Sequence, residues 1–142
     1  MLPANVVILE PVASIHDQLV EEFDKFFSDC NLRCSFTTTT QLQQAEKAIG
    51  ENRCDILISD LNFGQSEIKG LRIIRDLKMR YPDVFIIACS LGDPTIRQTL
   101  NNFPSFDMFI RKERVQNKRY GELELCKEIF SDKFCRLTGF RV

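Results

Sequence analysis

The sequence predicts an α/β fold, a doubly wound parallel sheet of five strands with helices on both faces. Short apolar runs alternate with amphipathic stretches along the whole chain, as successive βαβ units require. Three of these runs are apolar throughout, which is typical of strands covered on both faces of a parallel sheet. The length of 142 residues, with 44% hydrophobic and 27% charged residues, fits one globular domain. We therefore expect residues 1–142 to form a single domain.

The first half of the chain predicts three strands and two helices. Residues 6–9 and 54–60 are the apolar strands, whereas residues 32–36 alternate between apolar and polar side chains. Ser14 is the candidate N-cap of the first helix, and Thr40 that of a second helix that runs to about residue 49. Apolar residues at every fourth position define the buried face of the first helix, namely Ile15, Leu19, Phe23 and Phe27.

The second half predicts two more strands and three helices. A third helix over residues 71–81 must stop before Pro82, because proline disfavours helical geometry in the residue that precedes it. Residues 84–89 form the fourth strand, and Asp93 with Pro94 starts a fourth helix. A fifth, alternating strand covers residues 106–110, and a last amphipathic helix covers residues 123–137.

The strand patterns also predict the order of the strands. The second and fifth runs alternate, as edge strands often do, while the first, third and fourth are apolar throughout. The flavodoxin-like order 2-1-3-4-5 places the two alternating runs at the edges. In that order the carboxyl ends of strands one, three and four border one crevice, so Glu10, Asp60 and Ser90 should lie close together.

Composition argues against several classes of function. A net charge of −1 gives no general attraction to nucleic acid or to an anionic membrane, and the basic residues between 111 and 119 are expected to form a solvated surface. No apolar stretch approaches the roughly 20 residues that cross a bilayer, and the start of the chain lacks the features of a signal peptide. Six cysteines without a C-x-x-C pair indicate reduced thiols in a cytoplasmic protein. His16 is the only histidine, which excludes multi-histidine zinc sites, and we expect it on the surface.

Polar residues follow the strand ends, and their types suit phosphoryl transfer. Asp60 ends the third strand, where open α/β sheets place their chemistry, and is the first candidate for a reacting group. Glu10 beside it would repel the Asp60 carboxylate unless a cation lies between them, and Mg²⁺ prefers such oxygen ligands. Ser90 could donate a hydrogen bond to a phosphoryl oxygen, and Lys112 supplies a mobile positive charge. Together these groups suit transfer of a phosphoryl group onto an aspartate.

From about residue 5 to residue 137 the chain resembles a response-regulator receiver domain of bacterial two-component signalling, of the chemotaxis-receiver type. The resemblance implies that Asp60 is the phosphoacceptor and that Glu10, Asp60 and Asn62 bind Mg²⁺, with Asn62 contributing its backbone carbonyl. It implies phosphate-binding or switch roles for Ser90, Lys112 and Phe109. The residues that match are Glu10 after strand one, Asp60 and Asn62 after strand three, Ser90 after strand four, and Phe109 and Lys112 at strand five.

The same resemblance implies partners and a mode of signalling. A histidine kinase or phosphotransfer protein would donate the phosphoryl group, so the chain would be a signalling protein and not an enzyme. Phosphorylation would shift the fourth helix, the fifth strand and the last helix, the surface for a downstream protein target or a second copy of the chain. Only 30 residues follow Lys112, so we expect no separate output domain, no nucleic-acid partner and no membrane partner.

Three alternatives compete with a phosphorylated receiver domain. Receiver domains usually carry adjacent acidic residues after strand one, whereas Pro11 follows Glu10 here, which weakens the Mg²⁺ site. A degenerate receiver that binds proteins without phosphorylation is therefore the main alternative. Aspartate-nucleophile phosphohydrolases need a second aspartate where Asn62 stands, and a cysteine-phosphatase loop that starts at Cys89 would need an arginine where Thr95 stands.

Overall fold

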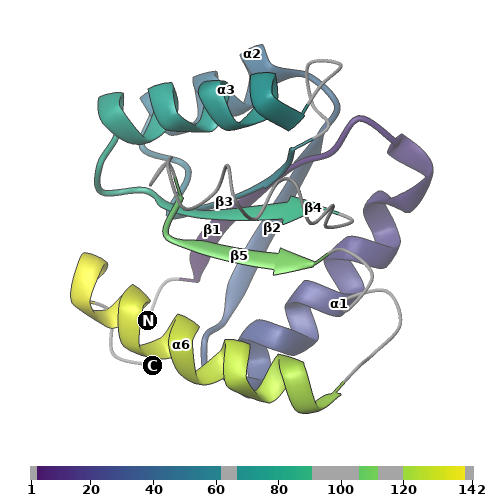
Figure 1. Cartoon of the computed structure of the whole chain (residues 1–142), viewed down its shortest axis with the longest axis vertical. Coiled ribbons are helices and arrows are strands. Elements are labelled where there is room, and N and C mark those ends of the chain that lie inside the picture. The colour runs from purple at the N-terminus through teal and green to yellow at the C-terminus, as the bar shows by residue number, and fades with distance from the viewer. Residues whose placement is uncertain (1–2, 62–66, 91–105, 112–119, 140–142) are drawn as a thin grey trace.

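The computed structural model describes residues 3–61, 67–90, 106–111 and 120–139, and its centre is a parallel sheet (Figure 1). The strands are β1 (Ala4–Leu9), β2 (Cys34–Thr39), β3 (Ile56–Asp60), β4 (Phe85–Ser90) and β5 (Met108–Arg111). Their order is β2-β1-β3-β4-β5, and each neighbouring pair runs parallel. The predicted fold class and strand order are therefore confirmed.

Helices cover both faces of this sheet. They are α1 (His16–Asp29), α2 (Leu42–Gly50), α3 (Glu67–Arg80) and α6 (Tyr120–Thr138). A short 3-10 helix, η1 (Ala13–Ile15), leads into α1. Figure 1 shows α2 and α3 on one side of the sheet and α1 and α6 on the other. The fourth helix predicted from the sequence lies outside the described residues. Within the described ranges, no helix combines the length and the apolar character that crossing a membrane demands.

Each face of the sheet has its own hydrophobic core. The core beneath α1 and α6 is rich in phenylalanine, whereas the core beneath α2 and α3 is mostly aliphatic. The predicted inner face of α1 is confirmed, because Leu19, Phe23 and Phe27 are buried and Ile15 packs against them. Phe26, which the four-residue spacing omits, is buried as well.

Burial along the strands explains their sequence patterns. Every residue of β3 is buried, as a central strand with helices on both faces requires. In β2, Ser35 and Thr37 are exposed while Cys34 and Phe36 are half-buried, because this strand forms an edge of the sheet. The continuous runs and the alternating runs of the sequence therefore correspond to central and edge strands.

Two predicted helix caps are wrong. Ser14 makes no capping hydrogen bond: it lies within η1, and this turn leads directly into α1, where Ile15 occupies the N-cap position. Thr40 is not the cap of α2, whose N-cap is Gln41. Instead, the Thr39 Oγ1 accepts a hydrogen bond of 3.0 Å from the Gln41 amide, which fixes the turn one residue earlier.

The third helix has the predicted end but a different start. It begins at Glu67 and not at residue 71, and its last residue, Arg80, precedes Pro82 as expected.

The cysteines that the structure describes are free thiols, and most are buried. Burial raises the pKa of Cys34 and that of Cys54 to about 12, and the Cys54 Sγ donates to the Ile56 carbonyl oxygen at 3.3 Å. A thiol with so high a pKa is almost entirely protonated at neutral pH and is a poor nucleophile. These residues therefore act as small packing residues and not as reactive groups.

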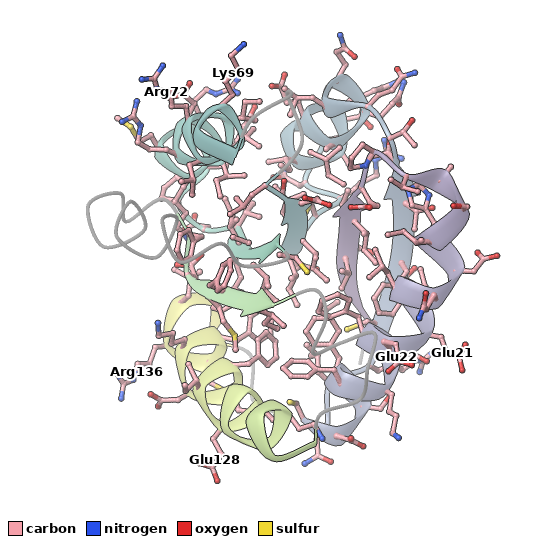
Figure 2. The ribbon with its side chains drawn as sticks, turned by 45° about the vertical axis from the view of Figure 1, so that its right-hand side comes forward. Glu21, Glu22, Lys69, Arg72, Glu128 and Arg136 are labelled. Atoms are coloured by element: carbon pink, nitrogen blue, oxygen red, sulfur yellow. The ribbon has the colours of Figure 1, made fainter. Side chains whose placement is uncertain are left out.

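The outer faces of the helices carry the charge. Figure 2 shows labelled acidic and basic side chains that point away from the sheet on three helices. These side chains are Glu21 and Glu22 on α1, Lys69 and Arg72 on α3, and Glu128 and Arg136 on α6. The buried acidic residues are therefore an exception, and they lie at the carboxyl ends of the strands.

Candidate functional site

Glu10 directly follows β1 and Asp60 ends the neighbouring strand β3, so both lie at the carboxyl end of the sheet. The register pairs Leu9 of β1 with Ser59 of β3, so the next residue of each chain segment, Glu10 or Asp60, stands at the same level. Asp60 in turn pairs with Cys89 of β4, and Ser90 follows Cys89 as the last residue of that strand. The predicted strand order therefore brings these three positions to one edge.

Both carboxylates are deeply buried. Glu10 is 1% exposed and Asp60 is 4% exposed, and with Ser59 at 2% they are the buried polar or charged residues of the described chain. Burial disfavours the charged form of a carboxyl group unless hydrogen bonds or a cation compensate it. A pair of buried acids at the carboxyl end of the sheet therefore needs hydrogen bonds or positive charge nearby.

The backbone around both acids is held on two sides. The Glu10 amide donates to the Thr39 carbonyl oxygen of β2 at 3.0 Å, and the Glu10 carbonyl oxygen accepts a hydrogen bond of 2.9 Å from the His16 Nε2. Beyond Asp60, the Leu61 amide donates to the Cys89 carbonyl oxygen at 3.1 Å. Both acids therefore sit on rigid backbone, although each comes at the end of its strand.

The segment after Asp60 packs tightly against α3. A Cβ atom added at Gly70 would overlap the carbonyl oxygen of Leu61, the residue directly after Asp60. Only glycine permits this close approach of helix and strand end. Gly70 thus fixes the position of the backbone that follows the candidate phosphoacceptor.

The remaining predicted site residues are described in part or not at all. Phe109 of β5 is half-buried and packs against the α2 and α3 core, with its ring centroid 6.2 Å from that of Phe106. Ser90 pairs with Arg111 in the sheet, and only its backbone belongs to the described part. Asn62 and Lys112 lie outside the described residues.

Comparisons with known proteins find relatives by structure alone. No family model matches the sequence, and no curated protein matches it. A response regulator from Thermotoga maritima superposes with a TM-score of 0.66 at 19% identity, covering 92% of this chain and 99% of that one. A signal receiver domain of an HD domain-containing protein from Pseudomonas fluorescens Pf-5 gives a TM-score of 0.66 at 14% identity, with coverages of 96% and 93%. A response regulator receiver domain protein from Clostridium thermocellum gives 0.61 at 14% identity, with coverages of 94% and 95%.

The chain has the fold of response-regulator receiver domains. The identities lie well below the level at which function follows from similarity, so the comparisons concern architecture and the site must be judged on its own residues. The receiver fold extends over nearly the whole chain and over nearly the whole of each of these relatives.

The two described acids of this receiver fold suit a hard divalent cation. Mg²⁺ prefers oxygen ligands and commonly uses one or two carboxylates together with water and phosphate. Glu10 and Asp60 supply two such carboxylates from adjacent strands. Within the described ranges there is no cluster of three or more acidic, histidine or cysteine side chains that could hold a metal alone, so a cation here would need further ligands.

The sequence patterns do not predict the contact between His16 and Glu10. His16 is half-buried and not on the open surface, and its ring bonds to the backbone of Glu10. The expectation of a surface histidine therefore holds only in part, because one side of the ring faces the end of β1. The only available signal is its position, six residues beyond Glu10 and at the first residue of the next helix, from which a ring can reach back to the strand end.

Proposed function

We propose that the chain is a response-regulator receiver domain that accepts a phosphoryl group on Asp60. The observation that carries this proposal is the position of Asp60, at the end of the fully buried β3 and level with Glu10, the residue directly after β1. A nucleophile held by a central strand keeps one orientation, which favours in-line attack on a phosphorus atom.

In the proposed reaction an Asp60 carboxylate oxygen attacks the phosphorus of a phosphohistidine on a histidine kinase or a phosphotransfer protein. A P–O bond to Asp60 forms while the P–N bond to the histidine breaks, and the imidazole leaves with the electron pair of that bond. The product is an aspartyl phosphate, which adds up to about two negative charges to an edge that already holds Glu10.

The residues around Asp60, together with a bound cation, would compensate the charge of the aspartyl phosphate. Glu10, Asp60 and the Asn62 carbonyl would hold Mg²⁺, which when bound would neutralise charge on the transferring group. Lys112 would add a second positive charge, and Ser90 would donate a hydrogen bond to a phosphoryl oxygen. Movement at Ser90 would then reach β5 and Phe109, because β4 and β5 are adjacent strands.

We propose that phosphorylation shifts the population between two conformations of the chain, and that the chain signals in this way and does not act on a small substrate. Such a switch needs two packings a few kcal/mol apart, of which the phosphorylated form favours one. The half-buried Phe109 ring lies at the side of the aliphatic core, where a ring can change its packing without opening the sheet. The downstream partner would be a protein, or a second copy of the chain, that binds one of the two states.

The test is phosphorylation of the purified chain with acetyl phosphate and Mg²⁺, followed by intact mass. The wild type should gain one phosphoryl group, and Asp60→Asn should gain none, because the amide has no nucleophilic oxygen. Asp132→Asn on the exposed face of α6 is the matched control and should be modified like the wild type. Beryllofluoride with Mg²⁺ should shift the amide resonances of β4 and β5 in the wild type and in the control alone.

A receiver that works without phosphorylation is the second candidate. The exposed Pro11 directly after Glu10 and the 4% exposure of Asp60 favour it, since both limit what the site can bind. Absence of any response that depends on Asp60 would contradict the first proposal and support this one. Sustained turnover of a generic phosphoester would contradict both and point to a phosphohydrolase.

A further inference from the structure

The connection between β1 and α1 places a histidine against the candidate site. After Glu10 the chain passes through Pro11 and the turn η1, and α1 begins at His16. The His16 ring then returns to the Glu10 carbonyl oxygen, with the Nε2 donating over 2.9 Å. This hydrogen bond closes a loop at the end of β1 between residues that are six positions apart.

The His16 ring has no evident role in stabilising its own helix. The N-cap of α1 makes no side-chain hydrogen bond, and the partner of the His16 ring lies outside the helix. A helix N-terminus favours negative charge, which Asp17 supplies in the first turn, whereas a histidine carries no negative charge and adds no such stabilisation. The contact to Glu10 is the interaction that accounts for this residue.

The two hydrogen bonds on Glu10 together fix its backbone. Its amide is bound to β2 through the Thr39 carbonyl, and its carbonyl is bound to α1 through His16. Pro11, which follows, has no amide hydrogen and adds no donor of its own to the turn. The bond to β2 therefore holds the peptide that precedes Glu10, and the bond from His16 holds the peptide between Glu10 and Pro11.

We infer that His16 is a positioning residue for the acidic site: it holds the Glu10 backbone so that the carboxylate stays level with Asp60. This inference rests on the proposed function, because it assigns His16 a role in forming the Mg²⁺ and phosphate site. A site that has one acid after β1, where two adjacent acids are usual, depends more strongly on the exact orientation of that acid. His16 supplies that orientation through the backbone and touches neither metal nor phosphate.

The test compares two substitutions that differ in one hydrogen-bond donor. His16→Gln keeps an N–H donor at similar reach, while His16→Leu keeps a similar size without a donor. Mg²⁺ affinity of the full chain is measured by calorimetry or by titration of amide resonances. We expect His16→Leu to weaken Mg²⁺ binding about fivefold, the loss of one ordinary hydrogen bond, and His16→Gln to stay near wild type.

A second measurement, on the metal-free chain, separates this inference from the proposed function. Hydrogen exchange at the Glu10 amide should accelerate in His16→Leu and stay slow in His16→Gln, whether or not the chain binds Mg²⁺. Equal exchange in all three proteins, or equal Mg²⁺ affinity in His16→Leu and wild type, would overturn the positioning role. A wild type that binds no Mg²⁺ and forms no beryllofluoride complex would instead refute the proposed function, while exchange at Glu10 would still decide the role of His16.

Discussion

The packing around Gly70 leaves no space for a side chain. Gly70 is the fourth residue of α3, and glycine within a helix is normally unfavourable because it costs about 1 kcal/mol relative to alanine. The Leu61 carbonyl oxygen occupies the space that a side chain would need. Local helix propensity and tertiary packing therefore oppose one another here, and packing against the segment after Asp60 decides the residue.

We predict that Gly70→Ala destabilises the chain by about 1–3 kcal/mol, because the added methyl group forces helix and strand end apart. Urea denaturation measures the change in the free energy of unfolding. Gly50→Ala is the matched control: this glycine ends α2, and a Cβ there would meet only the Tyr81 Oη, at an ordinary contact distance of 3.6 Å. Equal stability of the two variants would show that α3 can move away from Leu61 without cost.

At the scale of elements, two aspartates hold strand starts at the amino edge of the sheet. Asp55 precedes β3, and its Oδ2 accepts a hydrogen bond of 2.7 Å from the backbone amide of Asn5 in β1. Asp107 precedes β5, and its Oδ2 accepts a hydrogen bond of 2.8 Å from the Ile86 backbone amide of β4. In both cases the aspartate amide donates back to the carbonyl oxygen of the same partner residue. The same reciprocal pair thus fixes the register of two strand pairs.

The second of these pairs also anchors α3. The Lys78 Nζ donates to the Asp107 Oδ2 at 2.7 Å and to the carbonyl oxygens of Pro82 and Val84. Both charged side chains are about one-fifth exposed, at 19% and 20%, so solvent screens their attraction only in part. The end of α3, the turn before β4 and the start of β5 therefore meet at one ion pair.

We predict that Asp107→Ala lowers the free energy of unfolding by about 1–3 kcal/mol, because the Ile86 amide and Lys78 lose their shared acceptor. Asp107→Asn should cost less, since the amide oxygen can still accept from Ile86. Asp83→Ala, at an exposed aspartate in the turn before β4, is the control and should stay within about 0.5 kcal/mol of wild type. Urea denaturation followed by circular dichroism measures all three, and equal losses in the Asn and Ala variants would contradict the role of the Ile86 bond.

The contact between α1 and α6 should depend on pH. Lys127 of α6 donates to the Asp29 Oδ2 at 2.8 Å, and this hydrogen bond lowers the pKa of Asp29 from its ordinary value of 3.8. A lowered pKa means that the carboxylate stabilises the fold above pH 3.8 and that this contribution is lost as the pH falls through the lowered value. We predict that Asp29→Asn destabilises at pH 7 and that the difference from wild type shrinks below pH 3.8. Denaturation over this pH range checks it, and Lys127→Met, which removes the donor, should abolish the difference at pH 7.

The sequence was informative where local pattern determines structure. Strands, their order and the inner face of α1 follow from the periodicity of apolar residues, and the shared edge of Glu10 and Asp60 follows from strand order. The bonds of Asp55, Asp107 and His16 join a side chain to distant or non-helical backbone, for which no spacing rule exists. The depth at which the two acids are buried also depends on what covers them, which the sequence of the strands alone does not contain.

At the scale of the whole molecule, one ring joins the first helix, the last helix and the sheet. The Phe130 ring of α6 contacts Phe26 and Phe27 of α1 and Phe85 of β4, with ring centroids 5.8, 5.0 and 5.3 Å apart. It also stacks on Phe134 one turn further along α6, at 5.1 Å. The contacts with α1 link segments that are about a hundred residues apart in sequence, so closing this core brings the two ends of the fold together.

We predict that Phe130→Ala lowers the free energy of unfolding by about 3–5 kcal/mol, because it opens a cavity between α1, α6 and β4. Ile129→Ala is the control: this neighbouring side chain on α6 is 38% exposed and should cost far less. Urea denaturation followed by both circular dichroism and near-ultraviolet absorbance tests whether the two faces of the sheet unfold together. Coincident transitions in Phe130→Ala would show that both cores belong to one cooperative unit, whereas an early loss of α6 alone would show that the phenylalanine core folds separately from the aliphatic one.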